Sequence, residues 1–225
     1  LLLARTSGKT ALDAADSRPL LEAYGVRTPQ ETLATSPEDA VAFAEHIGYP
    51  VVLKIISPDI LHKSDIGGVG VEDARGVRDS FDTILARAKS AHPGARVRGV
   101  QVQEMVRGGH EVIVGVKRDP TFGPLVMFGL GGVYVEALAD VSFRLAPLTR
   151  ADAEELIDDV RSAKLLAGLR GAAPADRAAL VDAIVRISHL AAGHEEIAEL
   201  DINPLLVLPE GQGAVAVDAR IILSP

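Results

Sequence analysis

The chain has no cysteine and no tryptophan, and aromatic residues make up only 4% of its 225 residues. Without cysteine it has no disulfide framework, no thiolate metal site and no thiol nucleophile, which is compatible with a cytoplasmic protein. No apolar run approaches the roughly 20 residues of a membrane span, and residues 1–3 are too short for the apolar part of a signal peptide. We therefore expect no membrane association. The chain does not begin with methionine, which suggests a fragment or a trimmed chain.

The chain also lacks an excess of basic residues. It has 31 Asp and Glu against 23 Lys and Arg, which gives a formal net charge of -8. Proteins that bind nucleic acid hold its phosphates mainly with surplus Lys and Arg, so the charge argues against that class, although a single nucleotide can still bind locally. With 48% hydrophobic residues, the composition predicts a globular chain with one large domain or two lobes.

Two glycine motifs that are typical of nucleotide sites are incomplete. Residues 7–10 resemble the end of a P-loop, but Leu3 stands where that motif needs glycine, and no strand precedes it. Residues 129–132 lack the third glycine of a dinucleotide-binding fingerprint and lead into an extended segment. The sequence therefore argues against both sites, while a backbone nest for a phosphate or a carboxyl at 129–132 stays open.

Residues 198–218 predict a β-hairpin that carries oxygen-bearing side chains. Because strand side chains alternate between faces, Glu199, Asp201 and Asn203 share one face while the apolar residues between them turn to the core. Asp218, on the returning strand, is expected opposite Asn203 or Asp201. Carboxylate and amide oxygens suit magnesium. The alternative is an ordinary hairpin with a wet polar face.

Residues 50–56 form an apolar run interrupted by one lysine, Lys54. Such runs are typical of strands buried on both faces. Since an unpaired ammonium in a core is costly, we expect Lys54 to point out of the sheet into a cleft that holds an anion. The alternative is a lysine at the end of a strand that reaches solvent.

A polar, glycine-rich loop follows at residues 57–68. Gly67 and Gly68 would let backbone N–H groups turn toward a phosphate. His62 stands beside Lys63 and near a carboxylate, so its imidazole would be able to accept a phosphoryl group. A solvated loop histidine is the alternative.

A glycine turn at residues 107–109 joins two halves of the chain. The strand before the turn ends with Glu104, Met105 and Val106, and the strand after it starts at Glu111. A nucleobase at such a hinge would use the backbone and one carboxylate, with the other carboxylate on the ribose hydroxyls. A simple hairpin with two surface glutamates is the alternative.

Arg144 lies within an apolar run, where a guanidinium usually pairs with a carboxylate or a phosphate. Its partner could equally be Glu136 or Asp140. Apolar spacing and capping residues predict helices at 17–24, 37–47, 77–91, 150–160, 163–167 and 176–192.

Taken together, these motifs resemble an ATP-grasp domain. More narrowly, they are similar to the β subunit, or the fused module, of ADP-forming acetyl-CoA synthetases, which are acyl-CoA synthetases related to succinyl-CoA synthetase. The resemblance covers residues 17–222 and is carried by Lys54 in its strand, the 62–69 loop, the 103–106 hinge with Glu111, the 122–132 segment, and 201–205 with Asp218.

The resemblance implies an α/β (α+β) ATP-grasp fold of two lobes, each with a mixed or antiparallel sheet flanked by helices, and a nucleotide cleft between them. We expect a lead-in at residues 1–16 and an N-terminal lobe at 17–105 that contains the 62–70 glycine loop. The C-terminal lobe is expected at 106–225, with the magnesium hairpin at 197–219.

The resemblance also implies ATP or ADP with Mg²⁺ as ligands. His62 would accept the phosphoryl group and pass it toward a second phosphohistidine in a partner region. The remaining expected roles are phosphate contact by Lys54, Lys63, Gly67 and Gly68, charge neutralisation by Lys54 and Arg144, adenine binding by Glu104, Met105 and Val106, ribose binding by Glu111, and metal binding by Asn203 and Asp218 with Asp201 beside them.

The chain lacks a glycine loop for CoA and a second histidine segment, so we expect it to need a CoA-binding α subunit, separate or fused. The implied reaction is acyl-CoA + ADP + phosphate to acid + CoA + ATP, with a small acyl-CoA as substrate. The alternative is a non-catalytic, nucleotide-binding regulatory module of a fused protein acetyltransferase. An ATP-grasp carboxylate–amine ligase is disfavoured, because direct acyl-phosphate chemistry needs no histidine at position 62.

Overall fold

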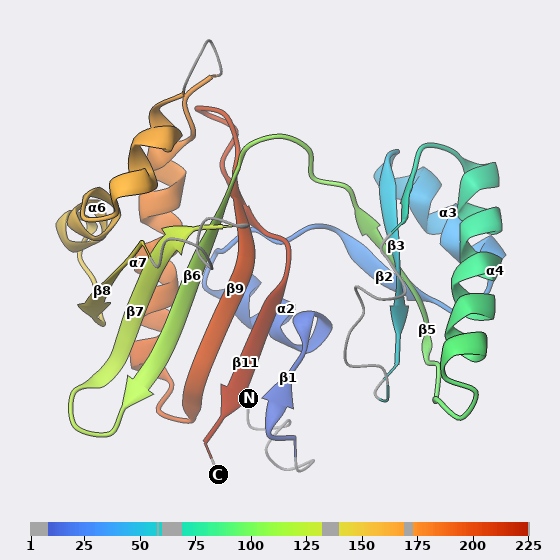
Figure 1. Ribbon diagram of the computed structural model, residues 1–225, viewed down its shortest axis with the longest axis horizontal. Coiled ribbons are helices and arrows are strands. Elements are labelled where there is room, and N and C mark those ends of the chain that lie inside the picture. Colours follow the sequence, from blue (N-terminus) through green and yellow to red (C-terminus); the bar gives the residue numbers. More distant parts are fainter. Residues whose placement is uncertain (1–8, 58, 60–68, 132–139, 169–172, 225) are drawn as a thin grey trace. The chain divides into compact units, whose positions relative to one another are not determined.

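The computed structural model describes residues 9–57, 59, 69–131, 140–168 and 173–224, and every structural statement below refers to these residues (Figure 1). Their contacts divide the chain into two compact units. The large unit contains the residues up to Thr28 and those from Arg107 onward, and the small unit is Pro29–Val106. The turn at 107–109 therefore lies where the chain passes from the small unit back into the large unit.

The small unit is a four-stranded antiparallel sheet with two helices. Val51, Leu53 and Ile55 of the strand β3 are buried with the apolar faces of both helices, whereas Val52 and Lys54 are only half-buried. The strand is thus covered on one face, and the prediction of a strand buried on both faces is wrong. The strand order is β2-β5-β3-β4, with β2 Glu31–Ala34, β3 Val51–Ile56, β4 Val69–Val71, β5 Gly99–Glu104, α3 Pro37–Ile47 and α4 Ala74–Ala91.

The two helices of the small unit begin at side-chain caps. The Ser36 hydroxyl accepts a hydrogen bond from the Asp39 N–H at 3.1 Å, and α3 starts one residue later, as predicted. In α4 the Asp73 carboxylate accepts from the Gly76 N–H at 2.7 Å, so this helix starts three residues before its predicted position. The sequence reading relied on the apolar stripe that begins at Val77 and overlooked the cap.

The large unit is a seven-stranded antiparallel sheet that is covered on one face by helices. Its main strand order is β1-β11-β9-β6-β7-β8, and β10 pairs with β9. The strands are β1 Ala11–Leu12, β6 His110–Asp119, β7 Gly123–Leu130, β8 Val141–Leu145, β9 Ile197–Val207, β10 Ala214–Ala216 and β11 Ala219–Leu223. The helical elements are α2 Ala14–Ala23, α6 Arg150–Asp158, the 3-10 helix η2 Arg161–Ala167 and α7 Arg177–Gly193.

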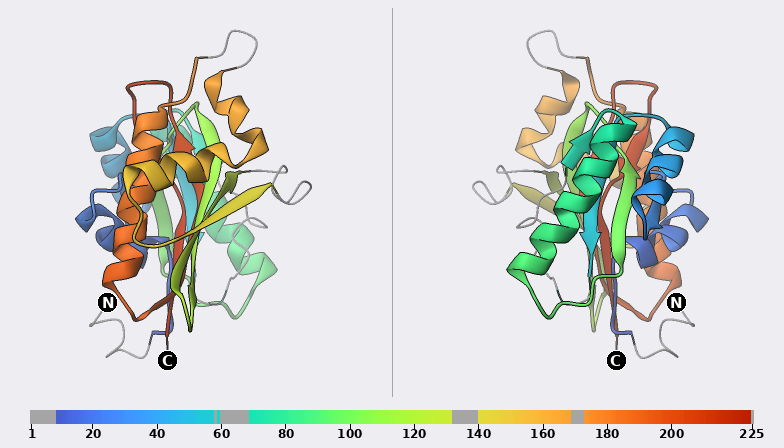
Figure 2. Two further views of the ribbon diagram at one scale, coloured as in Figure 1. Left: turned by 90° about the vertical axis from the view of Figure 1, so that its left-hand side faces the viewer. Right: turned by 90° about the vertical axis from the view of Figure 1, so that its right-hand side faces the viewer.

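The helices of the large unit share one core with the sheet, and they lie on one side of it (Figures 1 and 2). Alternate residues of β6 and β7, for example Val114 and Phe128, are fully buried under the helices. Arg118 fixes the passage from α7 into β9, because its guanidinium donates to the carbonyls of Ala191 at 2.6 Å, His194 at 2.8 Å and Ile197 at 2.9 Å. The side of the sheet without helices is called the open face below.

Three predicted features differ from the structure. The helix expected from residue 17 starts at Ala14, because Asp13 caps it by accepting from the Asp16 N–H, and Ser17 is buried inside it. Residues 17–28, expected in the first lobe, belong to the large unit. The alternative of a simple hairpin around 107–109 is wrong, since β5 and β6 lie in different sheets. In the part of the chain that the structure describes, no helix is both long and apolar enough to cross a membrane.

Candidate functional site

The open face of the large sheet carries the oxygen-bearing side chains of the predicted hairpin. In β9, Leu200 and Ile202 are buried in the core, while Asp201 and Asn203 are exposed on the opposite side. This alternation confirms the face assignment made from the sequence. Asn203 and Pro204 lie between the pairs Val114–Ile202 and Val112–Leu205, so two residues of β9 oppose one residue of β6. Such a β-bulge re-aims side chains and is frequent beside functional sites.

Asp218 lies opposite Asn203 across the hairpin. The Asn203 N–H donates to the Asp218 carbonyl at 3.1 Å, and the Val217 N–H donates to the Pro204 carbonyl at 3.1 Å. Asp218 is exposed and stands between β10 and β11. The structure thus brings together Asp201, Asn203 and Asp218, the three residues predicted to hold a metal.

The electrostatics of this group favour a bound cation. Partial burial of its carboxyl, followed by the negative charge of Asp218, raises the pKa of Asp201, and only Arg220 opposes this effect. The residue Asp201 is nevertheless exposed, so its carboxyl is only partly shielded from water. A divalent cation between the two carboxylates would relieve their repulsion.

The donor set also fits magnesium in its chemistry. Two carboxylates and one amide are hard oxygen donors, and Mg²⁺ fills its remaining positions with water and substrate phosphates. Within the described ranges, no three His, Cys, Asp or Glu side chains gather around one point, so the protein does not supply a complete metal cage there. The site is therefore suited to a metal that arrives with a phosphorylated ligand.

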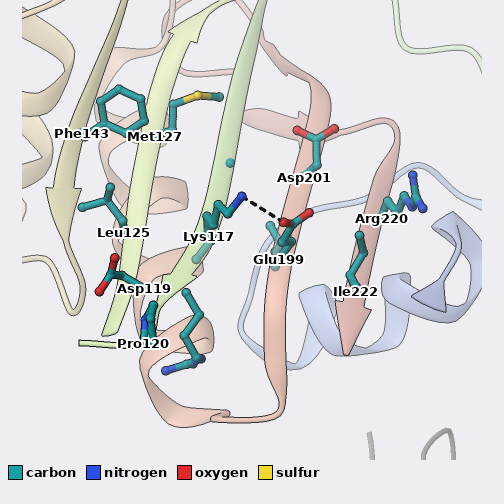
Figure 3. A pocket seen from close by; sticks show the side chains of 14 residues that line it. Lys117, Asp119, Pro120, Leu125, Met127, Phe143, Glu199, Asp201, Arg220 and Ile222 are labelled. Atoms are coloured by element: carbon teal, nitrogen blue, oxygen red, sulfur yellow. Dashed lines mark ion pairs between the residues drawn. The ribbon is translucent and has the colours of Figure 1, made fainter. Parts of the chain in front are cut away.

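A pocket of about 570 Å³ adjoins these residues on the open face (Figure 3). Asp201 and Arg220 line it on the β9–β11 side, and Met127 and Phe143 line it on the β7–β8 side. Lys117 also lines the pocket and forms an ion pair with Glu199 at 3.5 Å. The pocket thus has a charged side and an apolar side.

In the small unit, Lys54 is held by a chain of polar contacts. Its Nζ donates to the Gln103 Oε1 at 2.9 Å, and the Gln103 Nε2 donates to the Glu31 Oε2 at 2.8 Å. Gln103 is buried, with 2% of its surface exposed. Lys54 points away from the helices, as expected, but sequence reasoning missed the two residues that orient it. Alternation along β2 and β5 would have placed them on the same face as Lys54.

The predicted base-binding residues lie at the end of the small unit. The Glu104 carboxylate accepts from the Gln30 N–H at 3.2 Å, and the Glu104 N–H donates to the Gln30 carbonyl at 2.8 Å. The Met105 N–H donates to the Pro50 carbonyl at 3.2 Å. Glu104, Met105 and Val106 are all half-buried. Backbone contacts therefore position this segment.

Glu111, the predicted ribose ligand, is exposed near the start of β6 in the large unit. Its carbonyl accepts from the Gly131 N–H at 2.7 Å, and a Cβ on Gly131 would lie 3.0 Å from Glu111 backbone atoms. The absence of a side chain at position 131 thus allows this close approach without a shift of the Glu111 backbone. Because Gly131 uses its N–H here, this residue does not contribute a free donor to the backbone nest that the sequence left open.

Arg144 lies on the helix-covered face of the large sheet. In β8 the neighbouring Phe143 is exposed on the open face, so Arg144 points the other way, where its Nη2 donates to the Asp159 Oδ2 at 2.6 Å. Glu155 lies 3.8 Å from the same nitrogen. Strand alternation thus puts Arg144 on the opposite side of the sheet from Asp201, and its guanidinium pairs with a carboxylate there.

Asp140, one of the two partners expected for Arg144, has other hydrogen-bond partners. Asp140 accepts from the backbone N–H groups of Arg161 and Ser162 and so starts η2. The remaining predicted site residues, His62, Lys63, Gly67 and Gly68, lie outside the described residues, as does Glu136. Sequence reasoning also missed Arg220, although it stands two residues after Asp218 on the same face.

A family model described as an ATP-grasp domain matches residues 3–223. This chain belongs to the ATP-grasp family. Among proteins of known function, it is 47% identical to the β subunit of ADP-forming acetate–CoA ligase I from Pyrococcus furiosus, over 92% of this chain and 90% of that subunit. It is 48% identical to ADP-forming acetate–CoA ligase I from Archaeoglobus fulgidus, over 93% of this chain but only 30% of that protein.

Solved structures agree with this assignment. The chain matches dinucleotide-forming acetyl-coenzyme A synthetase 1 from Ca. Korarchaeum cryptofilum, in complex with coenzyme A, Ca-AMPCP and HgCl+, with a TM-score of 0.93 and 45% identity over 99% of this chain and 97% of that chain. Another structure of that synthetase contains coenzyme A and Mg-AMPPCP, with its phosphohistidine segment pointing towards the nucleotide binding site; its TM-score is 0.87 at 42% identity, again over 99% and 97%. The predicted α+β ATP-grasp fold is confirmed.

Proposed function

We propose that this chain is the ATP-binding, phosphoryl-transferring part of an ADP-forming acyl-CoA synthetase. The observation that supports this most is the group of Asp201, Asn203 and Asp218 on the open face, within a fold that matches a synthetase solved with a nucleotide analogue. The chain spans about 30% of the length of the Archaeoglobus relative, so the complete reaction requires a CoA-binding part, either a separate subunit or a fused region.

Each proposed residue has a defined task. Asn203 and Asp218, with Asp201 beside them, would hold Mg²⁺, which neutralises phosphate charge when bound. Lys54, oriented by Gln103, would contact the phosphates, together with Lys63 and the backbone of Gly67 and Gly68. The end of the small unit, Glu104 to Val106, would bind adenine, and Glu111 would bind the ribose. Positioning and charge neutralisation supply most of the catalysis in such transfers.

The proposed reaction passes through His62. One imidazole nitrogen of His62 attacks the γ-phosphorus of ATP, a new N–P bond forms, and the bond to the β,γ-bridging oxygen breaks, so ADP leaves with that electron pair. A histidine acceptor is supported by the Korarchaeum relative solved with Mg-AMPPCP, because that protein has a phosphohistidine segment that points towards its nucleotide binding site. The phosphoryl group would then pass to the CoA-binding part, where it is consumed with acid and CoA to give acyl-CoA and phosphate. The sum of the two reversible steps is acid + CoA + ATP to acyl-CoA + ADP + phosphate.

The test is incubation of the purified chain with γ-labelled ATP and Mg²⁺. Acid-labile, base-stable label on the protein is expected from the wild type and from His92→Ala, whose histidine is exposed at the end of α4. The His62→Ala variant should carry no label. Label that persists in His62→Ala would exclude His62 as the acceptor. If the wild type binds nucleotide but takes no label even with a CoA-binding partner, the chain is a nucleotide-sensing module.

A further inference from the structure

Arg220 is an exposed cation on the open face, directly beside the predicted metal donors. It lies in β11 opposite Asp201 in the strand register, and both line the pocket (Figure 3). The other cations of the pocket are engaged, since Lys117 pairs with Glu199 and the Arg118 guanidinium binds backbone carbonyls. Within the described structure, by contrast, no carboxylate lies within ion-pair distance of Arg220, although its positive charge acts to lower the pKa of Asp201.

The order of polar side chains along the open face suggests which ligand group meets Arg220. Glu111, the proposed ribose ligand, lies near the start of β6, and Gly115 pairs with Asp201 four residues further along this strand. Four residues of an antiparallel strand span about 13 Å. Asn203, on the neighbouring strand β9, lies beside β6 between these two positions. A nucleotide that extends from Glu111 past the predicted metal donor Asn203 would bring its terminal phosphoryl group to the neighbouring residues Asp201 and Arg220.

Gly115 keeps the space beside Asp201 open. It lies between Asp201 and Met127 in the sheet register and has no side chain, so the floor of the pocket is backbone there. A Cβ at this position would lie 3.2 Å from the Met127 Cε. A phosphoryl group therefore has space above the Gly115 backbone, next to Asp201 on the neighbouring strand.

We propose that Arg220 binds the terminal phosphoryl group of the nucleotide and so makes the site prefer a triphosphate to a diphosphate. This inference rests on the proposed function of the same site. A guanidinium suits the role, because its planar fork of N–H donors matches phosphate oxygens and stays charged at all working pH values. Arg144, the arginine that the sequence analysis expects to neutralise phosphate charge, points to the opposite face of the sheet.

The test compares the affinities of the full chain for Mg-AMPPCP and Mg-ADP by isothermal titration calorimetry. Arg220→Gln should weaken Mg-AMPPCP roughly tenfold or more while changing Mg-ADP by less than about twofold, since only the triphosphate loses a charge-assisted hydrogen bond. Arg220→Lys should recover part of the loss. Lys117→Gln is the matched control, as it removes another exposed cation from the same pocket, and it should leave the ratio of the two affinities unchanged.

The outcomes separate this inference from the function on which it rests. If the wild type binds both nucleotides and Arg220→Gln changes them equally or not at all, Arg220 does not contact the terminal phosphoryl group, while nucleotide binding stands. If Lys117→Gln changes the ratio as much as Arg220→Gln does, the effect is general charge and not a specific contact. If the wild type binds neither nucleotide, the proposed function itself fails, and the inference fails with it.

Discussion

Replacing Asp176 by alanine should destabilise the large unit and loosen the strand that carries the predicted metal donors. Asp176 is a buried residue that caps α7, where its Oδ1 accepts from the Ala179 N–H at 3.0 Å. Its Oδ2 accepts from the Gly213 N–H at 2.9 Å, in the turn between β9 and β10. One carboxylate thus joins the start of a helix to the turn of the candidate metal hairpin.

The magnitude follows from these two contacts. Loss of a helix N-cap costs about 1 kcal/mol, and loss of a hydrogen bond to a charged acceptor costs roughly 1.5 kcal/mol. Asp176→Ala should therefore lower the free energy of unfolding by about 2–3 kcal/mol and the melting temperature by roughly 4–12 °C. Asp176→Ser keeps an oxygen that caps the helix, but its side chain is too short for Gly213, so only the second contribution of about 1.5 kcal/mol should be lost.

Urea denaturation followed by far-ultraviolet circular dichroism measures these differences, and hydrogen exchange of a peptide that covers residues 208–215 reports on the turn. Exchange in this peptide should be faster in both Asp176 variants. Asp182→Ala is the control, since this half-buried α7 residue pairs with the exposed arginines Arg150 and Arg186 and its loss should cost less than about 1 kcal/mol. An alanine variant of Asp176 within about 0.5 kcal/mol of the wild type, or a serine variant with unchanged turn exchange, would refute the reasoning.

Three further predictions concern other parts of the molecule. Asn203→Ala or Asp218→Ala should weaken Mg-nucleotide binding roughly tenfold with little change in melting temperature, because both side chains are exposed; wild-type affinity in both variants excludes the metal site. Glu104→Gln should reduce the preference for ATP over GTP in equilibrium binding, and an unchanged ratio removes Glu104 from the base site. Hydrogen bonds from the Arg96 side chain and backbone lower the pKa of Asp59 from 3.8 to about 2. The folded pKa is thus below the unfolded one, so this pair stabilises the fold above about pH 4 and loses its effect as the pH falls toward 2. Arg96→Gln should therefore lose less stability than the wild type between pH 5 and pH 2 in acid denaturation, and identical curves contradict this assignment.

Local signals in the sequence predict some elements to the residue. The bounds of α3 follow from Ser36 as a cap and from Gly48 as the stop, because both signals lie next to the ends they specify. The faces of Asp201 and Asn203 follow from period-two alternation, which needs only the strand itself. Helix ends and strand faces of this kind depend on residues that lie close together in the sequence, so the sequence alone is enough to predict them.

Other features depend on choices between similar local signals or on distant contacts. Asp13 and Ser17 are both good caps, and Pro19 suggested the later start, but α2 begins at Ala14 with the proline inside it. The antiparallel pairing of β6 with β9 joins segments far apart in the chain, and no local pattern specifies it. Arg220 lies outside the predicted hairpin, which ends at Asp218, so alternation along that hairpin does not assign a face to it.

The central claim is that this chain exchanges a phosphoryl group reversibly with a nucleotide, and a label chase tests it most directly. The chain is labelled with γ-labelled ATP and Mg²⁺, freed of nucleotide by gel filtration, and then given unlabelled ADP with Mg²⁺. The proposal predicts that the label leaves the protein and reappears in ATP, because a phosphohistidine donates its phosphoryl group back to ADP. Label that stays on the protein, or that is released only as inorganic phosphate, would contradict the proposal.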